Sequence, residues 1–199
     1  MKSHLNSKIL VVSNSMPVTP GDSRHAFVTD QAVAMANLGV QVDLAIVRPW
    51  LRSLTPGSGW RNPDFDNRPD LLPLNSVIDI PFLALPLRID LLAWVKAGKL
   101  QTRKYRQSLG EKHYDAAIVH GETMGAIFAD TFKSIGLPFI FIVHSAGDSK
   151  SALNRRGQKV RNTCATKASY IALVGEGLKI PGLIRGKAEV IPNGLTVPN

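Results

Sequence analysis

The sequence predicts an α/β protein with a Rossmann-like, doubly wound and mainly parallel sheet of about seven strands and helices on both faces. Short apolar runs alternate with helical patterns along the whole chain, which is typical of successive βαβ units. Several of these runs are continuously apolar, as expected for strands that are covered on both faces. The 199 residues are 44% hydrophobic, so one core of ordinary size can form, and we expect a single domain.

The first strand and helix set the pattern for the rest of the chain. Residues 8–12 (KILVV) form an apolar run that predicts a strand, and residues 26–38 show the apolar spacing of a helix. Asp22 or Ser23 can cap the start of this helix, and Gly39 can end it. The irregular turn between strand and helix follows the carboxyl end of the strand, where open parallel sheets bind ligands.

A long interruption separates the second and third predicted strands. Residues 40–47 (VQVDLAIV) predict the second strand and residues 77–85 (VIDIPFLAL) the third. Residues 48–74 contain five prolines and follow neither a helical nor a strand period. Loops of this length are usually functional, so we expect an insertion that overhangs the site.

A basic amphipathic helix is expected at residues 88–110. Its inner face consists of Leu87, Leu91, Trp94, Gly98, Thr102, Tyr105 and Leu109. Beside this face runs a stripe of four cations, which we call the basic stripe: Lys96, Lys99, Arg103 and Arg106. Two interpretations stay open, a docked helix with a solvated charged face and a stripe that faces the anionic head groups of a membrane.

The second half of the chain continues the alternation of strands and helices. The run LPFIFIV is the most apolar of all, which indicates a central strand. Gly157 lies on the seam of the following helix and would allow it to approach the sheet closely. The expected elements are strands at 115–120, 137–143, 170–174 and 188–191, helices at 122–135 and 176–184, and between them a helix whose seam is Leu153, Gly157, Val160, Cys164 and Ala168.

Charge and cysteine content exclude several classes of protein. The net charge of +9 is concentrated in residues 88–106, with six basic side chains and one acidic, and in residues 150–167, with six basic and none acidic. No aromatic residues are interleaved with the second cluster, so we expect no nucleic-acid partner. The single Cys164 excludes an intrachain disulfide and a multi-cysteine metal site.

The expected location is the cytoplasm. No signal-peptide pattern is present, and no uninterrupted apolar run approaches the roughly 18 residues of a membrane span. The basic stripe leaves open a peripheral position at the inner face of the membrane.

The candidate site lies where three loops converge at the carboxyl ends of the strands, at residues 13–25, 120–123 and 144–149. His120 and His144 close two successive strands, and Glu122 and Asp148 follow them. Either histidine alone can equally well be a structural partner of a backbone carbonyl. Asp148 can equally well cap a helix. Together these side chains offer the donors and acceptors that a polyol or sugar requires.

Other kinds of site lack motif support. G-x-G-x-x-G and G-x-x-x-x-G-K-[ST] are both absent, which disfavours a nicotinamide enzyme and a P-loop NTPase. His120, Glu122 and His144 have no compact ligand spacing, so we expect no metal. Ser145 is not in a G-x-S-x-G elbow, and no nucleophile is assigned.

The chain resembles the family 4 glycosyltransferases, which have the two-domain GT-B fold. The opening KILVVSN, the following P-x-x-x-G-D and the helix AFVTDQAVAMANL are similar to the start of that family. YDAAIVHGETMG and GLPFIFIVHSAGD resemble its fourth and fifth strand ends, and AEVIPNGL resembles the end of its first domain.

This resemblance implies the N-terminal, acceptor-binding domain of a retaining hexosyltransferase. The donor would be a nucleotide sugar and the acceptor a saccharide or a lipid-linked saccharide. In that family a second domain binds most of the nucleotide and carries a paired-glutamate motif, and residues 1–199 contain neither. We therefore expect no cofactor in this domain and no useful turnover from it alone.

The resemblance also implies roles for individual residues. Ser15, Gly21 and Asp22 would face the cleft near the donor phosphates, His120 would lie beside the reacting sugar, and His144 would belong to the acceptor wall. Gly21–Asp22 stands where many members have two glycines, Glu122 where many have a second histidine, and Thr196 near the place of an acidic residue. Two alternatives stay open: a non-catalytic module that binds a sugar or anion, and another GT-B enzyme such as a nucleotide-sugar epimerase.

Overall fold

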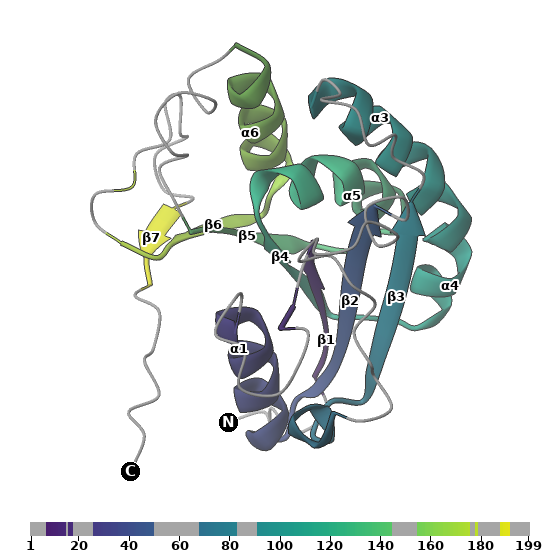
Figure 1. The fold of residues 1–199 in the computed structure, drawn as a ribbon, viewed down its shortest axis with the longest axis vertical. Coiled ribbons are helices and arrows are strands. Elements are labelled where there is room, and N and C mark those ends of the chain that lie inside the picture. The colour runs from purple at the N-terminus through teal and green to yellow at the C-terminus, as the bar shows by residue number, and fades with distance from the viewer. Residues whose placement is uncertain are drawn as a thin grey trace, which may run out of the picture.

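The computed structural model describes residues 7–14, 16–17, 26–49, 68–82, 91–144, 155–175, 178 and 188–191. In this part of the chain, seven strands form one all-parallel sheet with the order β3-β2-β1-β4-β5-β6-β7 (Figure 1). The predicted fold class is confirmed. The strands are β1 (Lys8–Ser13), β2 (Gln41–Pro49), β3 (Ser76–Phe82), β4 (Ala116–His120), β5 (Phe139–Val143), β6 (Tyr170–Leu173) and β7 (Ala188–Val190).

The strand order places a topological switch point between β1 and β4. From β1 the chain runs outward through β2 to β3, returns to the other side of β1, and then runs outward from β4 to β7. β1 and β4 pair directly, with Val12 opposite Val119. Crossovers leave such a pair in opposite directions, and in open α/β sheets ligands generally bind at the carboxyl ends of the two strands at such a point.

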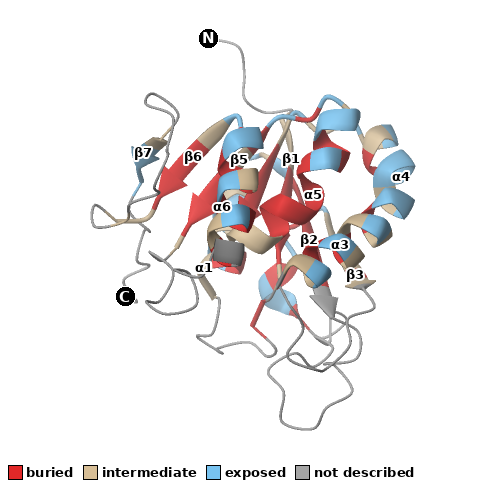
Figure 2. Ribbon diagram, turned by 90° about the horizontal axis from the view of Figure 1, so that it is seen from above, coloured by how far each residue is buried: buried red, intermediate tan, exposed pale blue. Residues whose placement is uncertain are grey.

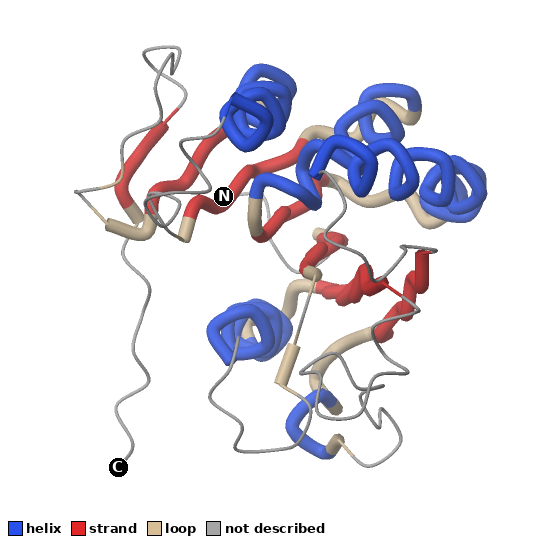
Figure 3. Tube along the Cα trace, turned by 45° about the horizontal axis from the view of Figure 1, so that its top comes forward, coloured by secondary structure: helices blue, strands red, loops and turns tan. Residues whose placement is uncertain are grey.

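The helices cover the two faces of the sheet unequally, as Figure 3 shows. One face carries α1 and the short 3-10 helix η2, while the other carries the remaining helices in a continuous layer. The helices are α1 (Ala26–Asn37), η2 (Pro69–Leu71), α3 (Leu91–Thr102), η3 (Arg103–Tyr105), α4 (Arg106–Glu111), α5 (Glu122–Ser134) and α6 (Arg155–Lys167).

Several predicted boundaries need correction. The long helix expected at 88–110 is α3 and α4 separated by one 3-10 turn, η3. β2 extends to Pro49, and η2 with the start of β3 occupies 69–76, so the predicted loop at 48–74 contains regular structure at both ends. Gly39, with φ of 87°, ends α1 as predicted. The expected cap residues Asp22 and Ser23 and, apart from residue 178, the short helix at 176–184 lie outside the described residues.

The core lies on both sides of the central strands, as the burial pattern in Figure 2 illustrates. In β1, Leu10 and Val12 pack under α5, while Val11 between them packs under α1. All three are fully buried. This double burial explains why the strand sequence is continuously apolar. Each fully buried side chain of this size contributes about 1.5–3 kcal/mol to folding.

Glycines set the spacing of the outer helical layer. A Cβ atom at Gly125 of α5 would lie 1.9 Å from Sγ of Cys164 in α6, and one at Gly98 of α3 would lie 2.5 Å from Cδ1 of Ile127 in α5. Gly157, the glycine that the sequence singled out, is buried. The close approach of α5 and α6 depends on Gly125, which the helical pattern of one helix alone does not reveal.

Candidate functional site

The candidate site lies at the carboxyl ends of β1, β4 and β5, beside the switch point. Ser13 is the last residue of β1, His120 is the last residue of β4, and His144 follows β5 directly. The parallel register places Val12 opposite Val119 and His120 opposite Ile142, so the three strand ends lie at one edge of the sheet. The predicted convergence of His120 and His144 is therefore seen in the structure.

The two histidines form a hydrogen-bonded pair. Nδ1 of His120 lies 2.8 Å from Nε2 of His144, the ring planes differ by 12°, and the ring centroids are 5.0 Å apart. A nitrogen–nitrogen distance of 2.8 Å is shorter than the spacing of stacked rings, so the two rings meet edge to edge, which favours an in-plane hydrogen bond. Phe27 of α1 packs against them, with its centroid 4.3 Å from that of His144.

Burial keeps His120 neutral. The residue is 4% exposed, and burial together with the neighbouring His144 lowers the pKa of His120 to about 3. Nε2 of His120 is buried and has no hydrogen-bond partner among the residues that the structure describes. A buried polar atom without a partner costs roughly 1–3 kcal/mol, which a ligand group at this position would recover.

The start of α5 follows His120 in the chain, with Gly121 between them. Gly121 caps the helix with φ of 85° and ψ of 145°, a backbone conformation that is essentially restricted to glycine. No atom lies within 4 Å of the position of a Cβ at Gly121, so the backbone conformation, and not crowding, requires glycine here. Gly121 lies in the predicted loop at residues 120–123, but its requirement for glycine depends on a backbone conformation that the residue type alone does not indicate.

Glu122 contacts α6 and not the histidines. Its Oε1 accepts a contact of 3.4 Å from Nη2 of Arg161, whose side chain is only 7% exposed. Arg161 belongs to the basic segment at residues 150–167, and the structure buries it against the first residue of α5. The ion pair ties α6 to the helix start beside His120.

Four predicted site residues, Ser15, Gly21, Asp22 and Asp148, lie outside the described residues. Among the described residues, no group of three or more histidine, cysteine, aspartate or glutamate side chains could hold a metal ion. The same part of the chain contains no helix that is both long and apolar enough to cross a membrane.

The basic stripe divides into one paired and three exposed cations. Lys99 of α3 donates from Nζ to Oδ2 of Asp130 in α5 over 2.7 Å, while Lys96, Arg103 and Arg106 are exposed. A groove of about 440 Å³ lies between these helices and is lined by Lys99, Arg103, Arg106, Ile127, Asp130, Thr131 and Ser134.

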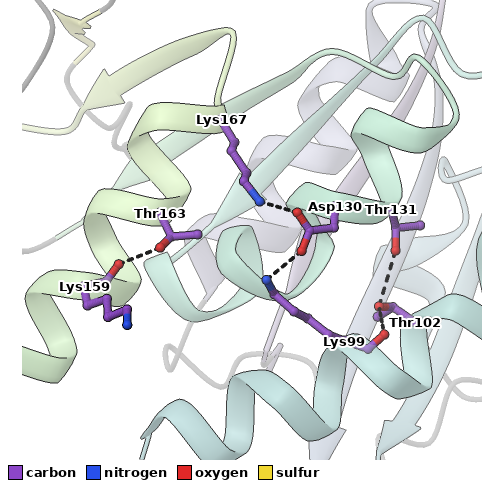
Figure 4. A network of polar contacts seen from close by, with 7 residues as sticks. All are labelled: Lys99, Thr102, Asp130, Thr131, Lys159, Thr163 and Lys167. Carbon is purple, nitrogen blue, oxygen red and sulfur yellow. Dashed lines mark hydrogen bonds and ion pairs between the residues drawn. The ribbon is translucent and has the colours of Figure 1, made fainter.

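Asp130 joins three helices, as Figure 4 shows. Besides Lys99 of α3, Lys167 of α6 donates to Oδ1 of the same carboxylate. The hydrogen bonds from Lys167 and Lys99 lower the pKa of Asp130 to about 2. Lys99 therefore has a structural role within the helical layer, which the helical pattern of α3 alone could not show.

A buried arginine anchors the loop that follows β1. Arg68 is 4% exposed and donates from Nη1 to the carbonyl oxygen of Pro17 over 2.5 Å. Its Nε and Nη2 atoms donate to the two carboxylate oxygens of Asp70 at 2.8 and 2.6 Å. Sequence analysis missed this residue because it lies in the proline-rich segment at 48–74, which carries no periodic signal.

No protein-family model matches the sequence, and no similar sequence was found among curated proteins. Solved structures are similar in fold. HepE from Anabaena, in complex with UDP and glucose, superposes with a TM-score of 0.62 and 16% identity over 95% of this chain and 45% of HepE. A sucrose-phosphate synthase from Thermosynechococcus elongatus superposes with a TM-score of 0.56 and 15% sequence identity, over 94% of this chain and 90% of that chain. A UDP-N-acetylglucosamine 2-epimerase superposes with a TM-score of 0.55 and 11% sequence identity, over 94% of this chain and 48% of that chain.

These similarities support the Rossmann-like α/β fold class. The chain has the Rossmann-like α/β architecture that these solved structures share. At identities of 11–16% the likeness concerns the fold alone. The chain spans about 45% of the length of HepE.

Proposed function

We propose that this chain is the acceptor-side domain of a retaining family 4 glycosyltransferase. The enzyme transfers a hexose from a nucleotide sugar to a saccharide or a lipid-linked saccharide. The observation that carries the proposal is the hydrogen-bonded His120–His144 pair at the switch point, in which His120 is neutral and a buried nitrogen of His120 has no partner among the described residues. The fold shared with HepE and sucrose-phosphate synthase supports it.

The residues of this domain position the substrate and stabilise charge. His120 hydrogen-bonds a hydroxyl group of the reacting sugar through Nε2, Phe27 and His144 form the wall beside it, and Ser15, Gly21 and Asp22 face the donor phosphates. Backbone amides at a helix start favour such anionic groups. No side chain acts as nucleophile. The acceleration comes from orientation and preorganised hydrogen bonds, while the leaving phosphate helps to take the acceptor proton.

The nucleotide itself is held mainly by a second domain that residues 1–199 do not include. This chain matches 45% of HepE, so the unmatched part of HepE is long enough to form such a domain. Under this proposal the 199-residue chain gives no useful turnover by itself, and the complete two-domain protein is the enzyme.

The test is a transfer assay on the complete gene product, with UDP-glucose as the first donor because HepE has been crystallised with it. The His120→Asn variant should lower kcat/KM by about 10²-fold or more, since it removes a preorganised hydrogen bond at the reacting sugar. His113→Asn is the matched control: His113 lies before β4, at the opposite end of the strand, and its φ of 49° is one that asparagine tolerates. Equal activity of the two variants would overturn the assignment.

The alternatives predict different products. An epimerase, as in the structural neighbour of that activity, would convert the nucleotide sugar into an isomer without an acceptor. A non-catalytic module would bind sugar saturably and give no product with any donor. Analysis of the products of the same assay separates the three functions.

We also propose that the protein is cytoplasmic and binds the inner face of the membrane through the basic stripe. Lys96, Arg103 and Arg106 are exposed, and the neighbouring Leu100 is 56% exposed. Each cation near an anionic surface contributes about 1 kcal/mol to binding. A lipid-linked acceptor would lie at the same surface.

A further inference from the structure

The His120–His144 hydrogen bond constrains both rings at once. Two neutral imidazoles that share one N–H···N bond have only two arrangements. Either Nδ1 of His120 carries the proton and Nε2 of His144 accepts it, or Nε2 of His144 carries the proton and Nδ1 of His120 accepts it. In the first arrangement both rings have the Nδ1–H tautomer, and in the second both have the Nε2–H tautomer.

We propose that His144 is a positioning residue that sets the tautomer of His120, and thereby decides whether Nε2 of His120 accepts or donates a hydrogen bond to the sugar. This inference rests on the proposed function and deepens it. Nε2 is buried at the switch point, and Nδ1 is occupied by His144 at 2.8 Å. The tautomer of His120 is therefore coupled to that of its neighbour, as in other sites where the hydrogen bond of one ring nitrogen fixes the state of the other.

The packing around the pair favours this coupling. Phe27 covers both rings, with its centroid 4.3 Å from His144 and 6.0 Å from His120, and His120 ends a buried strand. Neither ring can turn without leaving the N–H···N bond. Burial also keeps His120 uncharged, so this ring offers a neutral polar edge.

The chemistry of this edge identifies the group that it binds. A neutral ring has no charge to balance a diphosphate. A hydroxyl group both donates and accepts, so it matches Nε2 of His120 in either tautomer. The ligand group at this position is therefore a sugar hydroxyl, and the phosphates of the donor lie elsewhere in the site.

Long-range ¹H–¹⁵N correlation spectra of the ¹⁵N-histidine-labelled 199-residue chain test the coupling without ligand or turnover. At pH 7, His120 and His144 should show the same tautomer. His144→Phe, which keeps an aromatic ring but removes the hydrogen bond to Nδ1, should give a mixture of tautomers at His120. Different tautomers in the unmodified chain would overturn the proposal without any variant, as would an unchanged His120 in His144→Phe.

Titration of the same chain with glucose and with inorganic phosphate tests the ligand class. Glucose should move the Nε2 resonance of His120, and phosphate should not. A response to phosphate alone would overturn the hydroxyl assignment. If the tautomers are coupled but neither probe moves the resonance, the hydroxyl assignment and the proposed sugar site fail, while the role of His144 in setting the tautomer stands.

Discussion

Arg68 donates a hydrogen bond from Nη1 to the carbonyl oxygen of Pro17, 51 residues earlier in the chain, over 2.5 Å. The bond joins the segment before β3 to the loop that follows β1. The guanidinium fork also binds both oxygens of Asp70, so one side chain makes three hydrogen bonds in a fixed geometry.

Replacing Arg68 should destabilise the loop after β1. Arg68→Lys removes the planar fork, and a lysine cannot make all three bonds with the same geometry. We expect the free energy of unfolding in urea to fall by about 1–3 kcal/mol, the cost of a broken buried hydrogen-bond network. Arg106→Lys, the same change at an exposed position of α4, is the control and should change it by less than about 0.5 kcal/mol. Equal effects of the two would show that the bond to Pro17 has no structural role.

The buried carboxylate of Asp43 should make the fold sensitive to acid. Asp43 is fully buried in β2, and its carboxylate accepts hydrogen bonds from Tyr114 and Asn75, both at 2.6 Å, and from Lys112 at 3.1 Å. Burial raises the pKa of Asp43, but these donors outweigh burial and lower it from 3.8 to about 2.

Because the folded pKa is below the unfolded one, the stabilisation is complete above about pH 4 and is lost as the pH falls through 2. It amounts to about 2 kcal/mol. Between pH 5 and 2, the free energy of unfolding should therefore fall less steeply with decreasing pH for Asp43→Asn than for the unmodified chain. Asp30→Asn, at an exposed position of α1, should keep the original slope. A slope in Asp43→Asn identical to that of the unmodified chain would contradict the assignment.

The contact between α5 and α6 should tolerate no side chain at Gly125. Its Cβ would lie 1.9 Å from Sγ of Cys164, so Gly125→Ala forces the helices apart and should cost about 1–3 kcal/mol. Gly110→Ala in α4 is the matched control, because its Cβ would meet Cγ2 of Ile135 at an ordinary 3.7 Å. Removal of glycine from that helix should stabilise the protein by about 0.5–1 kcal/mol. Thermal melting measures the stability of both variants. If adding Cys164→Ala to Gly125→Ala does not restore part of the lost stability, the explanation is contradicted.

The exposed part of the basic stripe should bind anionic vesicles. At low salt, the double variant Arg103→Gln with Arg106→Gln should weaken sedimentation with phosphatidylserine vesicles by about 30-fold, at about 1 kcal/mol for each cation. The variant Lys133→Gln with Lys159→Gln removes the same charge from exposed positions of α5 and α6 and should have a smaller effect. An unmodified chain without preference for anionic over neutral vesicles would remove the membrane proposal.

The fold could be predicted because its signals are local. Continuous apolar runs and helical spacing recur along the chain, and a parallel sheet brings the carboxyl ends of its strands to one edge. For this reason His120 and His144 were identified from their positions at strand ends. Their hydrogen bond was not, since it depends on the register of β4 and β5.

Most of the missed features depend on contacts between distant segments. Arg68 meets Pro17, Lys99 meets Asp130, and Asp43 meets Tyr114, and these partners are 31 to 71 positions apart in the sequence. The 3-10 turn η3 between α3 and α4 contains no proline or glycine to mark it. A single sequence shows which side chains face inward, but not which partner each one meets.

The position of β1 in the sheet has a consequence for synthesis of the protein. β1 pairs with β2 and also with β4, and the backbone N–H of Lys8 bonds to the carboxylate of Asp115, 107 residues later. At about 5–20 residues per second, a ribosome needs roughly 5–20 s to make that stretch. During this time one edge of a strand with four consecutive apolar residues, Ile9 to Val12, has no native neighbour. The nascent chain is therefore most exposed to aggregation before β4 emerges, and chaperones that shield extended apolar segments would act in that interval.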